Sequence, residues 1–528
     1  MRAREGARPL YATLLAVVLH LPFVLRYDLH FQPDFAISML MSRAIALEGD
    51  RPIFFWAQAY LGTYGCYLTA LLFRLFGVSV ILACLVSLLI WACGVGLATA
   101  LAARLLGRGG AWWAAVAAAV ASPYANHYVT QPYTSYETAP VLSILAIAGL
   151  AWAERLVDRP LGARAAAGWI VLGLLLGFGW WTTRLFLPSL VAVALAILLC
   201  SGWRRVVVRR AALGMGLLLA AALLGGSPEL IYRVSAQQPG EDAPSFGLAP
   251  RAEISTNFRQ AVASLPAYFD GDSRARLPEG VSFAEALAIG TDPVPTDGVM
   301  PHVLAVVVDA VVRAALVALL VATAWTAGSA WRRRNLPLLA LCLTPFVHLV
   351  LVSLSAQTMG GYYNARRYWF ASLLVFPLLL ANAIVLAEGA RRGAVRWGGR
   401  AVAGFLLVAS LVTQARMLAL PDELADYRVL TRDLAASGER GVWMPTWNAW
   451  VVAALSGGTI DGVSNHYNRR QEVLERAAAR DHIAIVLPAG KDFPPGFRML
   501  DAVFVRGSGP VHPAGPWRWC SYDRADHG

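Results

Sequence analysis

Eleven apolar runs divide this sequence, and each is long enough, or nearly so, to cross a membrane as a helix. The hydrocarbon core of a bilayer needs about 20 mostly apolar residues per helix. The composition agrees, because 57% of the 528 residues are hydrophobic and only 15% are charged, whereas about a quarter of a soluble domain is charged. The sequence therefore predicts a polytopic α-helical membrane protein with about 11 transmembrane helices, near residues 10–26, 79–101, 111–125, 138–153, 167–181, 186–201, 211–232, 303–330, 336–355, 368–388 and 401–420.

Arginines between these runs predict how the helices are oriented. Every second short connection is basic, and basic connections favour the cytoplasmic side of a membrane. With a cytoplasmic N-terminus, an uncleaved first helix and an odd number of helices, the C-terminal tail lies on the extracytoplasmic side. The net charge of +12 resides in these short clusters and does not indicate a nucleic-acid partner. The basic connections contain Arg104, Arg108, Arg155, Arg159, Arg164, Arg204, Arg205, Arg209, Arg210, Arg332, Arg333, Arg334, Arg391, Arg392, Arg396 and Arg400.

Long segments gather on the opposite side of the membrane in this topology. Long irregular connections in a helical membrane protein favour a functional role. Within the first of them, the stretches Phe35–Leu47 and Tyr60–Phe76 carry apolar residues at helical spacing, which predicts two helices lying on the membrane surface. We expect a transmembrane domain over residues 1–420 and an extracytoplasmic domain over 421–528, with outer loops at 27–78, 122–137, 233–302 and 356–367.

The tail reads as a small α/β domain. Strand-like segments alternate with helical ones, which is typical of a partly parallel sheet. Helices are expected at 422–436, 448–455 and 469–480, and strands at 441–444, near 459–460 and at 482–487.

Asp34 is the candidate general base. It follows Pro33 at the predicted start of a surface helix, where the positive end of the helix dipole stabilises an anion. The local pattern alone favours the simpler role of a helix N-cap.

Two further groups of polar residues lie on the predicted outer side. Tyr133 and Glu137 lie in a segment dense in aromatic residues, which either forms an interfacial belt or stacks on sugars. Glu137 is a lone acid there, so we expect it to bind a sugar hydroxyl or a metal ion. Arg184, Arg366 and Arg367 either extend to lipid headgroups or bind a phosphate, for which guanidinium geometry is well suited.

Several motifs, in chain order, resemble those of GT-C-type membrane glycosyltransferases, the superfamily that includes aminoarabinose transferases and protein O-mannosyltransferases. The resemblance spans most of the chain, although no single motif is specific on its own. The motifs are Glu48-Gly-Asp-Arg-Pro-Ile-Phe-Phe55, Gln58-Ala-Tyr60-Leu-Gly62-Thr63, Leu75-Phe-Gly77, Gly177-Phe-Gly-Trp-Trp-Thr182, Gly226-Ser-Pro-Glu-Leu-Ile-Tyr232 and Ala365-Arg-Arg-Tyr-Trp369.

This resemblance implies transfer of a sugar from a polyprenyl-phosphate carrier to a glycan, lipid or protein acceptor, in a bacterial cell membrane. It assigns the role of general base to Asp34 and the binding of the carrier phosphate to Arg366 or Arg367. Gln58 and Tyr60 are expected to contact the substrate. The resemblance indicates no cofactor, and a requirement for a divalent metal ion remains an open alternative.

The sequence departs from the family pattern at two acids, since Phe35 follows Asp34 and Tyr64-Gly-Cys66 follows the Gln58 motif. These departures leave room for a non-catalytic scaffold. A transporter of lipid-linked glycans is the other alternative, and it would place charges or paired broken helices within the spans.

Overall fold

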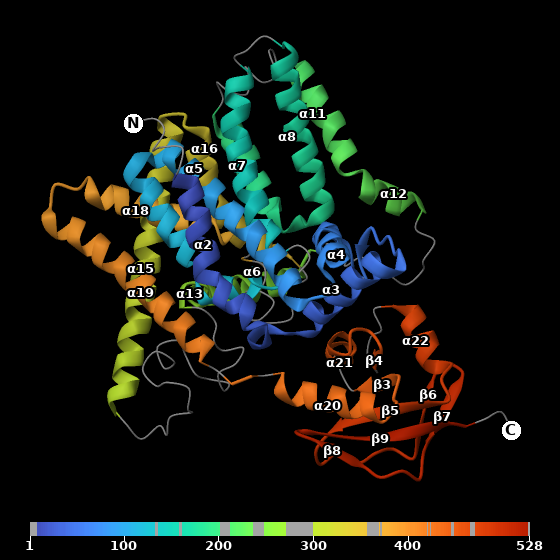
Figure 1. Cartoon of the computed structure of the whole chain (residues 1–528). Coiled ribbons are helices and arrows are strands. Elements are labelled where there is room, and N and C mark those ends of the chain that lie inside the picture. Colours follow the sequence, from blue (N-terminus) through green and yellow to red (C-terminus); the bar gives the residue numbers. More distant parts are fainter. Residues whose placement is uncertain are drawn as a thin grey trace.

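A bundle of long helices forms most of the molecule, and a small sheet domain lies at one end of it (Figure 1). The computed structural model describes residues 8–56, 58–132, 136–157, 161–200, 212–235, 248–270, 299–355, 369, 372–419, 421–422, 424–444, 448–464 and 470–525. The N-terminal end of the described chain, the end of α7 and the start of α8 lie at the end of the bundle opposite to the sheet domain.

Seven helices in the described residues are long and apolar enough to cross a membrane, or eight if the bent pair α11–α12 is one span. Each of the eleven predicted runs coincides for most of its described length with a helix. The counts differ because α9 (Leu187–Leu199) and α18 (Val375–Glu388) are short, and because two predicted runs are joined in α5. The seven are α2 (Arg8–Leu25), α5 (Val80–Val120), α7 (Thr138–Val157), α8 (Ala163–Thr182), α15 (Val299–Arg332), α16 (Leu336–Leu354) and α19 (Gly393–Leu418).

Helix α5 consists of two arms that meet at Gly107, which has φ 72° and ψ −166°. Such a positive φ favours glycine, because it has no Cβ. In the first arm, Gly96 lies against Thr13, near the start of α2. In the second arm, the Ala119 carbonyl contacts His20, near the end of α2. The second arm therefore runs back toward the end of α2, as two separate predicted spans require.

Helices α8 and α11 (Ala212–Gly225) pack backbone to backbone. A Cβ atom added at Gly173 would lie 2.2 Å from the Leu218 carbonyl oxygen, and one at Gly177 would lie 2.0 Å from that of Ala222. Small residues at helix contacts in membranes allow this close approach. The two helices run in the same direction, so that the end of α8 meets the start of α12 (Ser227–Ser235).

The first long connection, residues 26–79, contains helices and a hairpin. It holds η1 (Tyr27–His30), α3 (Pro33–Arg43), the π-helical turn η2 (Ala44–Glu48) and α4 (Tyr64–Phe76). The predicted helix over Tyr60–Phe76 begins only at Tyr64, because its first residues belong to a short antiparallel hairpin, β1 (Phe54–Phe55) and β2 (Gln58–Gly62).

Two helices that the predicted spans do not account for, one of them beginning in the last residues of run 111–125, complete the described bundle. α6 (Pro123–Val129) and α13 (Arg251–Asp270) pack against each other, and α13 also packs against α16. The Asn257 side chain donates to the Ser353 carbonyl at 3.3 Å, which fixes α13 to the end of α16.

The C-terminal domain is a seven-stranded mixed sheet with three helices, α20 (Ala425–Ala436), α21 (Ala449–Leu455) and α22 (Gln471–Ala478). β5 pairs in parallel with β3 and antiparallel with β9. Ala484 and Val486 of β5 pack into one apolar cluster, and Ile483 and Ile485 into another. Both faces of this strand are thus buried, which explains its continuous apolar sequence. The strands are β3 (Gly441–Met444), β4 (Asp461–Ser464), β5 (His482–Pro488), β6 (Gly496–Met499), β7 (Ala502–Arg506), β8 (His512–Ala514) and β9 (Trp517–Arg524).

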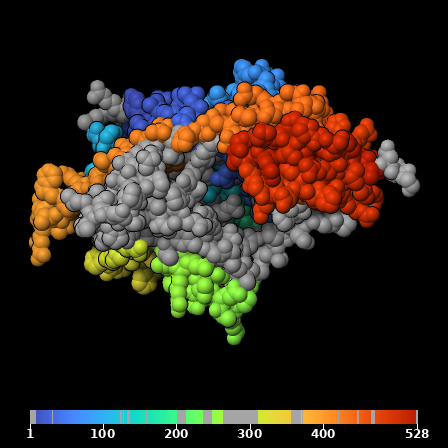
Figure 2. Space-filling model, turned by 90° about the horizontal axis from the view of Figure 1, so that it is seen from below, coloured from blue at the N-terminus to red at the C-terminus, as the bar shows by residue number. Residues whose placement is uncertain are grey.

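This domain contacts the first long connection directly, since α21 packs against α3. Figure 2 views the molecule from this end. A hollow beside the C-terminal domain, which is coloured red, reaches down to blue and teal atoms of the N-terminal part of the chain.

Candidate functional site

Asp34 lies in the first turn of α3, directly after Pro33. Its side chain is half-buried. Proline is well suited to the first helical position because its missing N–H has no partner there in any helix. The N-cap of α3 is Gln32, so the alternative in which Asp34 itself caps the helix does not hold. Asp34 is instead the second residue of α3, and an acid in the first turn of a helix is stabilised by the helix dipole.

The other acid of this short stretch has a structural role. Asp28 is buried and accepts hydrogen bonds from the Arg26 side chain at 3.0 Å and 3.1 Å. Arg26 in turn donates to the Leu418 carbonyl at the end of α19. Phe35, which stands where the resembled family often has a second acid, is fully buried and packs on the Phe31 ring at 4.5 Å between centroids.

The β1–β2 hairpin positions Gln58 and Tyr60 at the end of α8. Leu61 forms a bridge with Thr183, and the Trp181 indole donates to the Ile53 carbonyl at 3.1 Å. Gly62 permits this approach, because a Cβ atom there would lie 2.8 Å from the Thr182 Cα. Strand β2 therefore lies beside the residues that lead into Arg184.

Arg184 forms an ion pair with Glu229 at 2.6 Å, and Arg233 approaches the same carboxylate oxygen at 2.7 Å. Glu229 is buried, the Arg184 side chain is 12% exposed, and that of Arg233 is 57% exposed. The Arg184 guanidinium also lies 5.3 Å from the centre of the Trp180 ring. Two guanidinium groups and one carboxylate leave one net positive charge. We call Gln58, Tyr60, Arg184, Glu229 and Arg233 together the rim.

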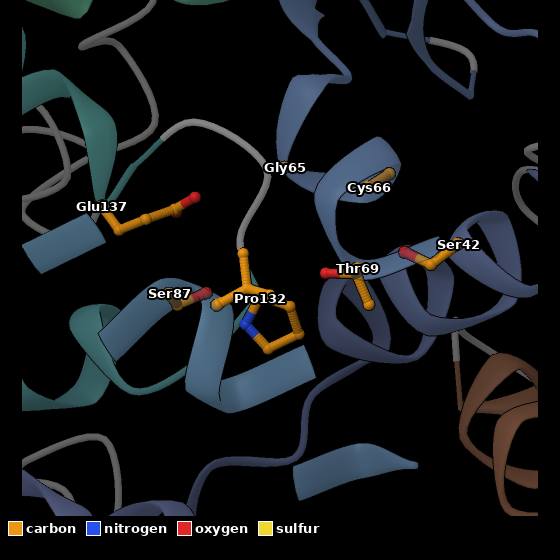
Figure 3. A pocket seen from close by; sticks show the side chains of 8 residues that line it. Ser42, Gly65, Cys66, Thr69, Ser87, Pro132 and Glu137 are labelled. Atoms are coloured by element: carbon orange, nitrogen blue, oxygen red, sulfur yellow. The ribbon is translucent and has the colours of Figure 1, made fainter. Parts of the chain in front are cut away.

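Glu137 lies immediately before α7 and is 1% exposed. Its side chain lines a small cavity, which we call the chamber, formed by Ser42, Gly65, Cys66, Thr69, Val86, Ser87, Pro132 and Glu137 (Figure 3). Its volume of about 10 Å³ is close to the minimum that holds one water molecule. Direct contact between Glu137 and a sugar would therefore require the surrounding segments to move apart.

The chamber is electrically neutral apart from this carboxyl group. The Oε2 atom of Glu137 has no hydrogen-bond partner among the described residues. Burial raises the pKa of Glu137 well above its ordinary value, because an ionised carboxylate without a cation is costly in an apolar environment. Burial likewise raises the pKa of the Cys66 thiol to about 12. Gly65 and Cys66, which replace an acid of the resembled family, thus line the chamber together with Glu137.

Three of the predicted site residues, Tyr133, Arg366 and Arg367, lie outside the described residues. In the part of the chain that the structure describes, no cluster of three or more His, Cys, Asp or Glu side chains suits a metal ion.

Sequence reasoning missed Glu229 and Arg233 as partners of Arg184. Their spacing of four residues was a usable signal, because side chains at i and i+4 are neighbours on a helix.

No protein-family model matches the sequence, and no match was found among curated proteins. Solved structures do share the fold. ArnT from Cupriavidus metallidurans bound to undecaprenyl phosphate is 10% identical with a TM-score of 0.58, over 97% of this chain and 98% of that chain. Archaeal oligosaccharyltransferase AglB from Archaeoglobus fulgidus, in complex with an inhibitory peptide and a dolichol-phosphate, is 13% identical with a TM-score of 0.50, over 91% of this chain and 69% of that chain.

A second AglB structure, determined with Zn and sulfate, is 12% identical with a TM-score of 0.52, over 90% of this chain and 67% of that chain. The fold is therefore the one that these membrane glycosyltransferases share, with a helical bundle and a C-terminal domain, as the sequence motifs predict.

Proposed function

We propose that this protein is a membrane glycosyltransferase, which moves a sugar from a polyprenyl-phosphate carrier to an extracytoplasmic glycan, lipid or protein acceptor. The observation that carries the proposal is the fold shared with ArnT over nearly the full length of both chains, since that protein was solved with undecaprenyl phosphate bound. The position of Asp34 at the start of α3 adds a carboxylate where the resembled family has its base.

The reaction is a direct displacement with inversion. The acceptor hydroxyl oxygen attacks the anomeric carbon of the sugar while the bond between that carbon and the phosphate oxygen breaks. The Asp34 carboxylate takes the proton of the hydroxyl, and polyprenyl phosphate leaves as the anion. A carboxylate within hydrogen-bond reach of the hydroxyl makes the oxygen more nucleophilic as the new bond forms.

The rim supplies positive charge for the carrier phosphate. Arg184 and Arg233 leave one net positive charge beside Glu229, and the guanidinium of Arg233 is largely exposed. Charge-assisted hydrogen bonds from guanidinium groups suit phosphate oxygens. Arg366 and Arg367 stay predicted as further phosphate ligands, and Gln58, Tyr60 and Tyr133 as contacts of the sugar. For Glu137 we propose a supporting role through the chamber, and substrate contact only after a loop movement.

The proposed topology places the N-terminus in the cytoplasm and the C-terminal domain outside a bacterial inner membrane. The arginine pattern supports it. In Figure 1 the start of α2, the end of α7 and the start of α8 lie at the end of the bundle opposite to the C-terminal domain, which agrees with that assignment.

Replacing Asp34 with Asn tests the proposal. Membranes with wild-type or variant protein are given a labelled polyprenyl-phosphate sugar, and transfer to endogenous acceptors is measured. Loss of a general base lowers the rate by about 10²–10⁴-fold. The matched control is Asp426→Asn, because Asp426 is likewise the second residue of its helix, α20, and loses a comparable helix-dipole interaction.

Transfer that falls at least a hundredfold in Asp34→Asn, with unchanged protein abundance and an active control, would support the base role. Equal transfer by Asp34→Asn and wild type would contradict it. A wild-type protein that transfers no sugar from any carrier tried would contradict the proposed function itself.

A further inference from the structure

The C-terminal domain is seated on the helix that carries Asp34. Trp450 and Val451 of α21 are buried in the same apolar cluster as Phe35 and Ile37 of α3. Trp450 is 1% exposed, and it belongs to the cluster with α3 and not to the apolar clusters inside the C-terminal sheet domain. An aromatic side chain of this size contributes a large buried area at such a contact.

A second contact holds the segment between α3 and the hairpin. Arg470, just before α22, has its guanidinium 4.8 Å from the centre of the Trp56 ring. Its nitrogens lie 3.5 Å from the Glu48 carboxylate and 3.8 Å from that of Asp50. Glu472 orients the same guanidinium, accepting hydrogen bonds at 2.9 Å and 3.0 Å. We call Glu48, Asp50, Trp56, Arg470 and Glu472 the clamp.

The clamp continues into α3. Glu48 accepts a hydrogen bond from Arg43, the last residue of α3, at 2.5 Å. The Arg43 guanidinium lies against Gly458 of the C-terminal domain, where an added Cβ would be 3.3 Å away. Glu48 therefore joins arginines from the two domains. The side chain of Arg470 is 18% exposed, whereas those of Glu48 and Glu472 are 43% and 66% exposed, so its ion pairs are partly screened by solvent and the Trp56 ring contact is the more sheltered one.

The two contacts enclose the parts of the first long connection that the proposed function uses. α21 rests on the helix that begins with Asp34, and Arg470 rests on Trp56, two residues before strand β2 with Gln58 and Tyr60. Between the contacts, η2 is followed by Gly49 with φ 78° and by irregular chain up to β1. Within that stretch the Pro52 carbonyl accepts hydrogen bonds from Thr63 and Tyr67. The clamp is the contact through which the C-terminal domain adds to the position of β2 relative to α3.

We propose that Arg470 is a positioning residue for sugar transfer, which acts by fixing strand β2 and α3 relative to each other through the clamp. This inference rests on the proposed function, and it assigns a role in the reaction to the C-terminal domain. Arg470 touches no reacting atom. We expect replacement of Arg470 to lower the rate of transfer more than the affinity for the donor, because displacement of a positioned group by about 1 Å costs as much as 10²-fold in rate.

The experiment compares Arg470→Ala and Arg470→Lys with the control Arg498→Ala in full-length protein in detergent micelles. Arg498 is an exposed arginine on the edge strand β6 of the same domain. Amide hydrogen exchange is followed over residues 54–62, and kcat and KM are measured with a labelled polyprenyl-phosphate sugar. We expect Arg470→Ala to speed exchange over 54–62 and to lower kcat about tenfold with KM nearly unchanged.

Arg470→Lys keeps the charge but loses the planar stacking on Trp56. It should recover part of kcat and part of the exchange protection, while Arg498→Ala should match wild type in both. Unchanged exchange over 54–62 in Arg470→Ala would overturn the proposal, and so would faster exchange with unchanged kcat. If wild type transfers no sugar, the proposed function fails, whereas faster exchange in Arg470→Ala would still support the clamp.

Discussion

The rim and the chamber place a buried carboxyl group in opposite electrostatic surroundings. At the rim, Glu229 is held between two guanidinium groups, one buried and one exposed. In the chamber, Glu137 faces a thiol, hydroxyl groups and apolar surface, in a space for about one water molecule. A buried charge is tolerated when it is paired, and otherwise the group becomes neutral. The difference teaches that the rim keeps charge where we propose that the carrier phosphate binds, whereas the chamber excludes charge.

The largest effect that would sharpen this comparison is expected from Glu229→Ala. Removing the carboxylate leaves Arg184 largely buried without its counter-ion, and breaking a buried pair in this way costs about 3–5 kcal/mol. We expect a strongly lowered unfolding temperature in detergent micelles.

Glu388→Ala is the control for this change. Glu388 pairs with Arg400 at 2.9 Å, but both side chains are considerably more exposed, and such surface pairs contribute about 0–1 kcal/mol. Equal losses for the two variants would show that the rim triad is no more than a surface pair.

Glu137→Gln tests whether the chamber acid is neutral. Because the pKa of Glu137 is raised on folding, the folded protein holds a proton that the unfolded chain releases above about pH 4.5. The stability that depends on this bound proton is fully present below that pH. It is lost as the pH rises toward the pKa of Glu137 in the folded protein. Wild type should therefore lose up to about 1.4 kcal/mol per pH unit through this group, whereas the neutral amide should lose nothing.

Thermal unfolding of both proteins at pH 5, 6.5 and 8 measures this difference, which should grow in favour of Glu137→Gln as pH rises. Glu137→Ala should be less stable than wild type at pH 5, because it leaves an empty space. A constant difference between Gln and wild type across these pH values would mean that Glu137 is ionised and that the comparison is wrong.

The smallest effect on stability is expected from Arg233→Gln. Glu229 keeps its pair with Arg184, so stability should change by less than about 0.5 kcal/mol. If the rim binds the carrier phosphate, KM for the donor should rise about tenfold, the loss expected for one charged hydrogen bond. Arg392→Gln, an exposed arginine in the α18–α19 connection, serves as control. A donor KM that is the same in both variants would remove Arg233 from the phosphate site.

The spans and the first elements of the C-terminal domain were predictable because apolar runs and periodicity determine them locally. β3 has the predicted bounds, and α20, α21 and α22 lie within three residues of theirs. Strands β6–β9 were not predicted. β6–β7 and β8–β9 pair with their sequence neighbours, but these hairpins join the sheet only through β9, whose partners β5 and β7 lie farther away in sequence. The β1–β2 hairpin was missed because its strands are short and its apolar residues also fit the period of α4.

The candidate site contains residues that local signals predict and residues that such signals do not reveal. The helix start at Asp34 was predicted from Pro33, which is a local signal, whereas the proposed role of Asp34 as a base came from the resemblance. The burial of Glu137 was not, because the chamber is formed by α3, α4 and α5 together. The partners of Arg184 were missed because they lie on another helix, although Glu229 and Arg233 carry their own pairing signal.

The contact between α8 and α11 has a consequence for how the protein responds to its lipid surroundings. The glycines that bring these helices together leave no space for either to slide or tilt alone. Arg184 follows the end of one helix, and Glu229 begins the bent continuation of the other. The charged groups of the rim are therefore attached to two helices that are packed tightly together. A change in membrane thickness should shift these groups as a unit while their mutual geometry persists.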